Sequence, residues 1–547
     1  MPFLSTTTYG RLSGPFSIRL LSTEQKNYIK YQIKLGAYWT LLIWVTLGGL
    51  SIGYFILHQD WLDRQYPAPP EWNIVLRYLW RNAKEEELTE GHGRGVIDWS
   101  YVGSRYRAVV GLSENFKIIV DIPSGILAQH DYDRTLPGLD ERDMQTPPDS
   151  EYWLNRIGFD VSMKSEAWIR GYYEAMMGLC KAAEFQESYV QDTTRNICFP
   201  REQMVGPSNP RPRPVPPGSP EAPREENCKP AFDSPHFLYR RLLTTTGFNR
   251  TQRVRAGLAY AQWLDYHGET DLAHDMYKWS LGIAIDGLPS PASSTIDAKT
   301  AVIQSSAATV SRNLLAATTA LASHYARTGA VSAALPIYLS VLRARRAAPN
   351  AAAQYPAAGP DYSLQSFDSF LRWVSAIPFG SAFPDAPPSG DDAFTRTAAD
   401  SCEEAALMAY VGEILFAQGG GAGEQREQGL AWTREATAMA ERGHEDRRLE
   451  AGARRTCTQC VSTGLGNWQR MVGQLAGEAR GGVEAANVRA SWTSSWRGRA
   501  GEQGRTGAVD WEAEEEMVTR RLSTFKKAQL DARLKAAISG TSSWFVA

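Results

Sequence analysis

The stretch LGAYWTLLIWVTLGGLSIGYFILHQ, residues 35–59, carries no charged side chain, and it decides how the rest of the chain is organised. About 20 apolar residues span the hydrocarbon core of a bilayer as an α-helix, so this stretch is long enough to cross with some tilt. The hydrophobic region of a secretory signal peptide is shorter and ends at a small-residue cleavage site, which is missing here. A buried core helix is the alternative. We predict one transmembrane helix at residues 35–59 and a large domain on one side of the membrane.

Basic residues gather on the N-terminal side of this stretch. Five lysine and arginine residues precede it against a single acidic residue, Glu24, whereas Asp60 and Asp63 follow it. Positive charge stays on the side from which insertion starts. We therefore expect the N-terminal tail in the cytosol or the matrix and the large domain across the membrane. The mitochondrial intermembrane space and the secretory lumen both agree with this topology.

The first 23 residues favour mitochondria. They contain two arginines, many serines and threonines and no acidic residue, which is the composition of a transit peptide. The sequence RLLS at residues 19–22 also resembles a matrix-processing site. A glycosylation sequon begins at Asn249, but one sequon is expected by chance in a chain of 547 residues. We predict a single-pass protein of the mitochondrial inner membrane, with its N-terminus in the matrix and its large domain in the intermembrane space.

Gly49 and Gly53 form a GxxxG pattern within the apolar stretch. This spacing lets two membrane helices approach closely. Glycine is frequent in membrane helices generally, so the pattern is weak on its own. Gly49 and Gly53 are therefore candidate residues for helix packing in the membrane.

The overall composition excludes several classes of protein. A net charge of -2 gives no reason to expect a nucleic acid as partner. Six cysteines in 547 residues are too few for a disulfide scaffold. Cys457 and Cys460 form one CxxC without the second pair or the nearby histidines of a zinc site. We interpret them as two residues on the same side of a helix that an oxidising compartment is able to oxidise.

No catalytic motif is present in the sequence. The chain lacks GxxxxGK[ST], HExxH, GxSxG and a GxGxxG that follows a strand. The glycine-rich residues 91–95 are interpreted as a loop, and the glutamate runs at 85–87 and 514–516 as solvated helix faces. His130, His236 and His267 are isolated in the sequence. We predict that the protein is not an enzyme and has no cofactor and no metal site.

Small and aromatic residues recur in two helical units. In AGLAYAQWLDYHGETDLAHDMYKWSLGIA, residues 256–284, the pattern matches the 34-residue tetratricopeptide (TPR) unit, in which small residues let two helices pack closely. LASHYARTGAVSAALPIYLSVL, residues 321–342, repeats it. Looser matches follow at 405–418, 429–441 and 463–479. The predicted structural residues are Ala261, Leu264, Gly268, Ala273, Tyr277 and Leu281 in the first unit and Ala322, Tyr325, Gly329, Ala334, Tyr338 and Leu342 in the second.

The remaining segments complete the predicted organisation. Residues 71–88 favour an amphipathic helix with Trp72, Val75, Leu76, Leu79, Trp80 and Ala83 on one stripe, residues 153–185 favour a helical pair, and strands remain possible at 106–112 and 117–122. The expected fold is all-α, a TPR-like solenoid with one N-terminal transmembrane helix and disordered insertions. Its parts are a transit segment (1–23), the transmembrane helix (35–59), a helical region (71–198), a linker with ten prolines (199–230), TPR-like repeats (231–346), an Ala/Pro-rich insertion (347–400), further TPR-like helices (401–480), a flexible segment (481–510) and a C-terminal helix (511–537).

A TPR solenoid presents a concave face to proteins or extended segments. The aromatic residues Tyr260, Trp263 and Tyr266 lie on the first helix of the first unit. Trp263 and Tyr266 are less constrained by the repeat pattern than Tyr277, Tyr325 and Tyr338. We therefore predict that Tyr260, Trp263 and Tyr266 contribute to protein binding.

Three stretches resemble one known family. PAPPEWNIVLRYLWRNA (67–83) follows the membrane span, EAWIRGYYEAMMGLCKAAEF (166–185) precedes the TPR units, and CTQCVSTGLGNWQRM (457–471) follows them. Together they resemble the fungal TPR-containing adaptor of the i-AAA protease of the mitochondrial inner membrane. The resemblance implies a protein that binds unfolded or misfolded membrane proteins and passes them to the AAA protease, alongside that protease's other adaptor subunits, without cutting peptide bonds itself.

Other functions stay open at this stage. A TPR scaffold for assembly of a respiratory or import complex has the same composition, so only its partners separate the two. An enzyme or a glycoprotein-processing factor of the secretory lumen is another alternative, which a glycan on Asn249 would support. A receptor of the outer membrane would place the large domain in the cytosol, against the charge bias around the apolar stretch.

Overall fold

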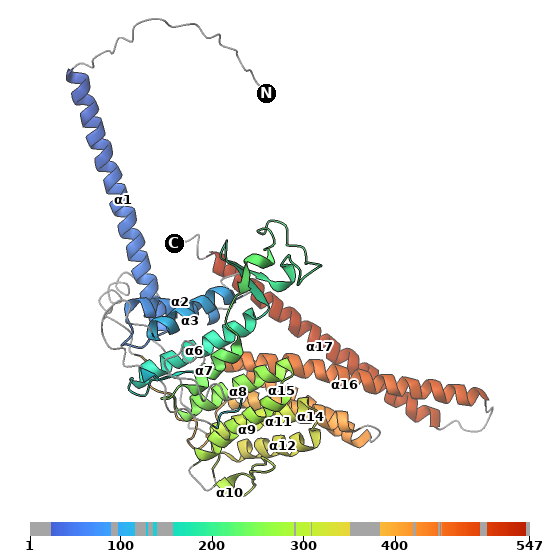
Figure 1. Ribbon diagram of the computed structural model, residues 1–547. Coiled ribbons are helices and arrows are strands. Elements are labelled where there is room, and N and C mark those ends of the chain that lie inside the picture. Colours follow the sequence, from blue (N-terminus) through green and yellow to red (C-terminus); the bar gives the residue numbers. More distant parts are fainter. Residues whose placement is uncertain are drawn as a thin grey trace, which may run out of the picture. The chain divides into compact units, whose positions relative to one another are not determined.

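The computed structural model shows a mostly helical chain with one apolar helix near the N-terminus and a few short strands (Figure 1). This confirms the helical class that the sequence predicts. Several predicted segments lie outside the described residues, namely 1–22, 91–95, 117–122, His130 and most of the insertion at 347–400. The described residues are 23–88, 97–114, 127–128, 135–138, 157–288, 292–307, 309–350, 383–419, 423–446, 449, 451–492 and 500–542.

The first of two compact units ends at Gln65, and its described part is the helix α1 (Thr23–Gln65). In the described part of the chain, α1 is the one helix long and apolar enough to span a membrane. Leu41, Trp44 and Leu50 are 66%, 72% and 72% exposed along it. Apolar surface of this extent requires a cover, and a bilayer supplies one.

The second unit begins with helices that pack in chain order. They are α2 (Ile74–Leu88), α3 (Trp99–Glu114), α6 (Glu166–Gln186) and α7 (Pro235–Thr244). The buried residues Trp72 and Trp80 pack edge to face, as do Trp80 and Tyr106. A Cβ atom at Gly178 of α6 would lie 2.4 Å from the Tyr106 ring. Glycine therefore sets the close approach of α3 and α6.

Two predictions for this region need correction. Val75 is 47% exposed, so it lies outside the buried stripe that its neighbours Trp72, Leu76, Leu79, Trp80 and Ala83 form. The possible strand at 106–112 is part of α3, because Tyr106, Val109 and Val110 share one buried helical face at a spacing of three and four residues.

The helical pair predicted at 153–185 is also wrong in its first half. Strand β2 (Phe159–Asp160) pairs with β1 (Leu127–Ala128), and only α6 follows it. The side chain of Asp160 accepts the amide proton of Ser162 at 2.9 Å and so forms a turn. Ser165 then caps α6 by accepting from the amide of Trp168 at 3.2 Å. These two polar residues begin the helix later than the apolar pattern suggests.

The proline-rich residues 199–230 are ordered where a linker was predicted. A three-stranded antiparallel sheet in the order β4-β3-β5 is formed by β3 (Tyr189–Asp192), β4 (Ile197–Pro200) and β5 (Cys228–Pro230). Two short 3₁₀ turns, η2 (Arg201–Gln203) and η3 (Glu225–Asn227), flank the loop between β4 and β5. The Asn209 amide donates to the carbonyls of Glu202 and Met204, both at 2.9 Å. Side-chain bonds of this kind satisfy carbonyls that proline, which has no N–H, leaves unpaired.

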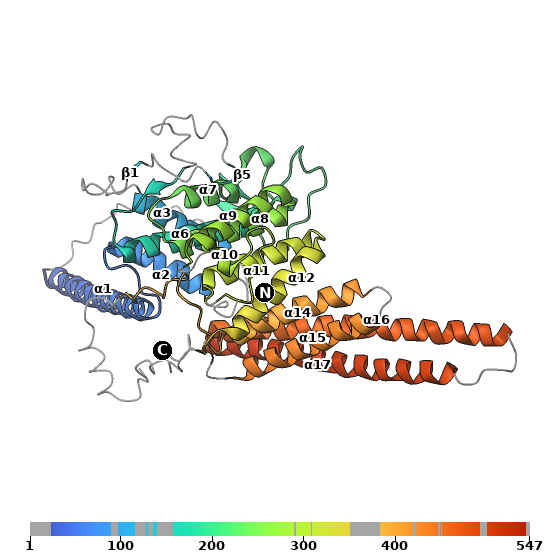
Figure 2. The same cartoon turned by 90° about the horizontal axis from the view of Figure 1, so that it is seen from below.

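Helical hairpins follow along the described part of the second unit, from α8 to α17 (Figure 2). Each hairpin packs against the next one, through α9 on α11, α12 on α14 and α15 on α16. A short helix, α10 (Ala292–Thr295), lies between the first two hairpins in the chain. The hairpins are α8 (Arg250–His267) with α9 (Thr270–Asp286), α11 (Arg312–Arg327) with α12 (Val331–Ala347), α14 (Asp400–Gln418) with α15 (Gly423–Glu445), and α16 (Ala451–Trp492) with α17 (Ala500–Ser542).

The first two hairpins place their predicted TPR residues in matching positions. Gly268 caps α8 with a φ of 80°, and Gly329 follows Thr328, the cap of α11, with a φ of 84°. Glycine adopts this left-handed conformation without a steric penalty. Tyr325 is only half-buried. The buried residues are Ala261, Leu264, Ala273, Tyr277 and Leu281 in the first hairpin and Ala322, Ala334, Tyr338 and Leu342 in the second.

The glycine-rich segments near the C-terminus are more helical than predicted. Helix α16 continues to Trp492 and α17 begins at Ala500, so most of the segment 481–510 is helical rather than flexible. Alanine, glutamate and arginine favour helix strongly enough to offset a few glycines. The end of the insertion at 347–400 is also packed, since the Asn313 side chain on α11 donates to Asp391 at 2.8 Å.

Candidate functional site

A cavity of about 890 Å³ opens between α2, α6, α7 and α8. Its lining combines apolar and charged side chains from segments far apart in the sequence. We call it the α6–α8 groove. Its lining residues are Lys84 and Glu87 from α2; Tyr173, Glu174, Met177, Gly178, Lys181, Glu184 and Phe185 from α6; Glu187 just after it; Tyr239 from α7; and Arg255, Ala259, Gln262, Trp263 and Tyr266 from α8.

The apolar part of the α6–α8 groove has a fixed base and an exposed edge. Tyr173 is 4% exposed, and Trp263 packs against the core and against the His267 ring at a centroid distance of 4.4 Å. Phe185 and Tyr266, in contrast, are 52% and 85% exposed. Exposed aromatic side chains beside a concave surface are typical of sites that bind other proteins.

The carboxylates of the groove already have partners inside the protein. Ion pairs join Glu87 to Lys181 at 3.0 Å and Glu174 to Lys84 at 3.1 Å. The carboxylate of Glu187 lies 2.9 Å from Nε2 of His267. Glu184 accepts a hydrogen bond from the Tyr239 hydroxyl at 2.7 Å. The acceptors that line the groove are therefore used to hold α2, α6, α7 and α8 together.

Two of these carboxylates have pKa values shifted in opposite directions. Burial raises the pKa of Glu184, and the hydrogen bond from Tyr239 only partly opposes that effect. For Glu87, burial also acts to raise the pKa, but the charge of Lys84, the Tyr106 hydroxyl and Lys181 together outweigh it and lower the pKa. Glu87 is thus a firmly ionised structural group, whereas Glu184 loses its charge more readily.

Three of the lining residues carry a hydrogen-bond donor without a partner among the described residues. Among the described residues, no partner lies within hydrogen-bond distance of the Tyr173 hydroxyl or the Trp263 indole N–H, although both atoms are buried. Burial raises the pKa of Tyr173 well above its ordinary value, so the hydroxyl keeps its proton. Arg255 is exposed and has no carboxylate within 4 Å in the described part of the chain. A buried donor without a hydrogen bond is costly, so the Tyr173 hydroxyl and the Trp263 N–H are candidates for pairing with water or after a local rearrangement.

A second cavity of about 620 Å³ adjoins the first. Gln262 of α8 lines both, so the two cavities follow one surface across the successive hairpins. Burial raises the pKa of Glu413 in this second groove. The remaining lining residues are Ser323, Ala326, Arg327, Val331, Tyr338, Tyr410, Ile414 and Ala417.

The structure separates the three predicted binding residues. Trp263 and Tyr266 line the α6–α8 groove. Tyr260, however, is fully buried; its hydroxyl lies 2.6 Å from Nδ1 of His236, and its ring stacks on Tyr239. Tyr260 is therefore a packing residue, because its position on α8 faces α7 rather than the groove.

Sequence reasoning missed the α6 side of the groove. Tyr173, Met177 and Lys181 recur every four residues along α6, so they lie on one helical face. This stripe of apolar and basic side chains on one face of α6 indicates that the face could line a binding surface. The sequence does not show that α8, about 80 residues further along the chain, lies opposite this face.

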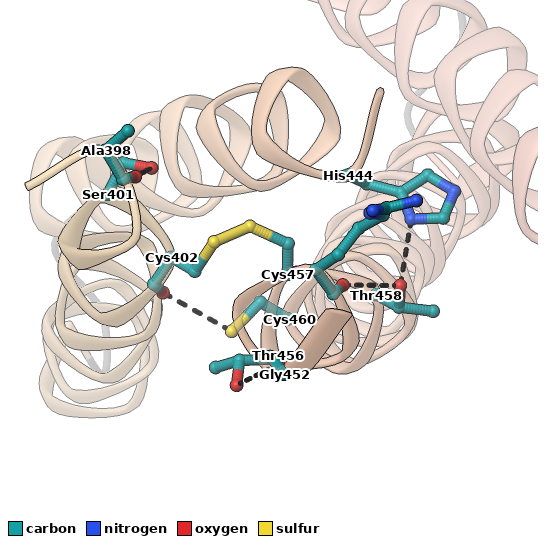
Figure 3. The surroundings of a disulfide bond; sticks show 10 residues. Ala398, Ser401, Cys402, His444, Gly452, Thr456, Cys457, Thr458 and Cys460 are labelled. Atoms are coloured by element: carbon teal, nitrogen blue, oxygen red, sulfur yellow. Dashed lines mark hydrogen bonds between the residues drawn. A yellow bond between two sulfur atoms is a disulfide. The ribbon is translucent and has the colours of Figure 1, made fainter. Parts of the chain in front are cut away.

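A disulfide bond joins two of the C-terminal hairpins. Cys402 of α14 and Cys457 of α16 are bonded, with their Cα atoms 4.9 Å apart (Figure 3). The thiol of Cys460, one helical turn after Cys457, lies 3.5 Å from the carbonyl oxygen of Cys402. Cys457 and Cys460 thus share a helix side, as predicted, but the oxidised partner of Cys457 is Cys402, which is 55 residues away in the chain and could not be recognised from the CxxC spacing.

No group of three or more histidine, cysteine, aspartate or glutamate side chains suited to a metal ion occurs within the described residues. No family model, curated protein or solved structure matches this chain.

Proposed function

We propose that this protein is a membrane-tethered, TPR-like adaptor that binds protein substrates in the intermembrane space and presents them to an inner-membrane AAA protease. The observation that carries the proposal is the α6–α8 groove, in which Trp263 and the exposed Tyr266 line a cavity of about 890 Å³. Such a groove suits binding of extended segments. The apolar helix α1 supplies the tether.

The succession of hairpins supports a TPR-like repeat. The left-handed Gly268 and Gly329 each lie two residues before the next helix, and the buried Ala273 and Ala334 each follow five residues later. The second cavity continues from α8 onto α11, α12 and α14, so first helices of three hairpins contribute to it together with α12. In a solenoid the first helices line the concave face, so a single extended segment is able to contact several repeats.

The disulfide supports an oxidising location for the large domain. Disulfide bonds persist in oxidising compartments and are rare in the cytosol. The bond between Cys402 and Cys457 therefore favours the intermembrane space or the secretory lumen over a domain that faces the cytosol. The N-terminal sequence, which resembles a transit peptide, favours the intermembrane space over the secretory lumen.

The tether has a direct benefit for an adaptor. Two proteins held in the same membrane meet at a much higher effective concentration than two soluble proteins. A groove that binds its substrate with low affinity is then sufficient to retain an unfolded or misfolded membrane protein near the protease. The other adaptor subunits of that protease are the expected neighbours.

A mild-detergent pull-down of the tagged full-length protein from isolated mitochondria, followed by mass spectrometry, tests this proposal. We expect an inner-membrane AAA protease among the recovered proteins. The double variant Trp263→Ala, Tyr266→Ala should retain the protease and lose substrate proteins, whereas Arg520→Gln on α17 serves as a matched surface control. Recovery of respiratory or import subunits in place of the protease would favour the assembly-scaffold alternative. A glycan on Asn249 would move the protein to the secretory lumen.

A further inference from the structure

We propose that the start of α2, at Ile74 and Val75, inserts into the surface of the bilayer that α1 crosses, and that this contact holds the α6–α8 groove close to the membrane. The inference rests on the membrane tether of the proposed function and names the substrate class of the groove. It derives from the exposure of the two side chains, from the fixed turn that precedes them, and from the length of α2.

Ile74 and Val75 are neighbouring aliphatic residues that the described part of the chain leaves uncovered. Ile74 is 83% exposed, a larger fraction than the 72% of Leu50 in the apolar stretch of α1, and Val75 is 47% exposed. The side chain of Asn73 caps α2 by accepting from the amide of Leu76 at 2.8 Å. The two exposed residues therefore lie in the first turn, where acidic side chains are favoured and β-branched ones are weak helix formers. Since helix formation does not require them there, their exposure favours an apolar partner outside the chain.

A turn with fixed geometry precedes α2. The amide of Trp72 donates to the carbonyl of Pro69 at 3.1 Å, and Nε of Arg77 donates to the carbonyl of Trp72 at 2.9 Å. Pro69 and Trp72 are buried. A Cβ atom at Gly171 of α6 would lie 2.4 Å from the Pro69 ring and 2.9 Å from the Trp72 ring, so glycine lets the turn pack directly on α6. The start of α2 is therefore held in a defined position on the large domain.

The bilayer around α1 is an apolar partner within reach of this surface. Ile74 follows Gln65, the last residue of α1, by nine residues, and a chain of that length spans at most about 30 Å. The turn from Pro69 to Trp72 shortens this path further. Trp61, which is 53% exposed, suits the interface between lipid and water, so the bilayer surface lies near the end of α1. Aliphatic side chains that reach this interface are buried at the boundary between headgroups and acyl chains.

The length of α2 then limits the height of the groove above the membrane. Lys84 and Glu87, which line the α6–α8 groove, follow Ile74 by ten and thirteen residues on the same helix. At 1.5 Å per residue these separations are about 15 Å and about 20 Å. An extended chain covers 20 Å in about six residues. The substrate class of the groove is therefore the segment of a membrane protein that directly follows its membrane span.

Photo-crosslinking of the purified full-length protein in phosphatidylcholine nanodiscs tests the membrane contact. The photoreactive residue p-benzoylphenylalanine replaces Ile74, Trp44 in the apolar stretch, or Arg520, whose side chain is 76% exposed on α17. Mass spectrometry of the irradiated protein identifies phospholipid adducts, and circular dichroism checks the fold of each variant. We expect adducts at positions 74 and 44 and none at position 520.

The three positions separate the inference from the tether. An adduct at position 44 without one at position 74 overturns the inference and leaves the tether intact, whereas no adduct at either position overturns both. A cross-link between two protein chains at position 74 would show that a second copy covers Ile74 and Val75. Equal labelling at positions 74 and 520 would show that lipid contact is not confined to the start of α2. Either result also overturns the inference.

A second measurement tests the height of the groove. Fluorescence anisotropy follows a dye-labelled apolar decapeptide that is either free in solution or anchored in the nanodisc by a lipid chain and a six-residue linker. Wild-type protein should prefer the anchored form, and the double variant Ile74→Ser, Val75→Ser should reduce that preference about tenfold. Arg520→Gln is the matched control and should keep the preference. An equal preference in wild type and double variant, or no binding of either peptide, would overturn the assigned substrate class.

Discussion

Nδ1 of His324 on α11 lies 2.8 Å from Oδ1 of Asp265 on α8, and both side chains are buried. The other carboxylate oxygen of Asp265 lies 2.9 Å from Nη2 of Arg327 and accepts from the Tyr277 hydroxyl of α9 at 3.1 Å. One carboxylate therefore connects three helices from two successive hairpins. A buried polar group of this kind fixes the register of neighbouring elements when all its bonds are made.

Asp265→Asn should destabilise the large domain by about 3 kcal/mol, because it leaves buried donors facing a neutral amide. Urea unfolding of the full-length protein in detergent, followed by circular dichroism, measures the change. Asp275→Asn on the exposed face of α9 is the control and should change stability by less than about 0.5 kcal/mol. Equal stability of the two variants would show that the network adds nothing to hairpin packing.

Reduction of the Cys402–Cys457 bond should lower stability by about 4 kcal/mol, since the bond closes a loop of 55 residues in the unfolded chain. The comparison is between oxidised and dithiothreitol-treated protein in thermal unfolding. Cys457→Ser should unfold like the reduced wild type, and Cys198→Ser should retain the oxidised stability. Non-reducing peptide mapping checks the pairing itself; a bond from Cys460 to either of the other two cysteines would contradict it.

Tyr260 and Tyr266, both on α8, should respond to alanine substitution in opposite ways. Tyr260→Ala removes a fully buried ring and should cost about 4 kcal/mol of unfolding free energy. Tyr266→Ala removes an 85% exposed ring and should change stability by less than about 0.5 kcal/mol while weakening peptide binding. Unfolding curves and anisotropy on the same samples separate the two effects. Loss of fold in the Tyr266 variant would refute its placement at the groove edge.

The β3–β4 hairpin should loosen in acid. Hydrogen bonds from the Thr194 hydroxyl and amide, together with Arg195, lower the pKa of Asp192 from 3.8 to about 2, although desolvation acts in the opposite direction. Because the folded pKa lies below the unfolded one, this stabilisation is complete above about pH 3.8 and is lost as the pH falls towards 2. Hydrogen exchange of peptides that cover β3 and β4 measures it. Asp192→Asn should show no such change over that interval, and a similar pH response in this variant would exclude Asp192 as the cause.

The sequence predicted those features that depend on local periodicity. The apolar run at 35–59 is the centre of α1, and the small residues Ala261, Gly268 and Ala273 occupy the turn and the tightly packed faces of the first hairpin. These features follow from length, from 3.6-residue spacing and from the left-handed glycine at the end of α8.

Features that depend on distant pairing could not be predicted in this way. The sheet at 189–230 pairs β3 with β4 and β5, and side-chain bonds such as those of Asn209 hold the loop between β4 and β5; a high proline content reveals neither. Tyr260 and Tyr266 are both aromatic and lie on the same helix, and only the packing of α7 on α8 buries the first and leaves the second exposed. The groove itself requires α6, whose contacts with α8 bridge a separation of about 80 residues.

The bond between Cys402 and Cys457 also has a mechanical meaning. It turns the chain between these residues, which contains α15, into a closed covalent ring. A pulling force applied beyond Cys457 passes through the sulfur atoms to α14 and cannot stretch the ring. A protein that delivers substrates to an ATP-driven unfolding motor is itself exposed to traction. If the proposed adaptor function holds, the cross-link would oppose extraction of this chain part-way along its length.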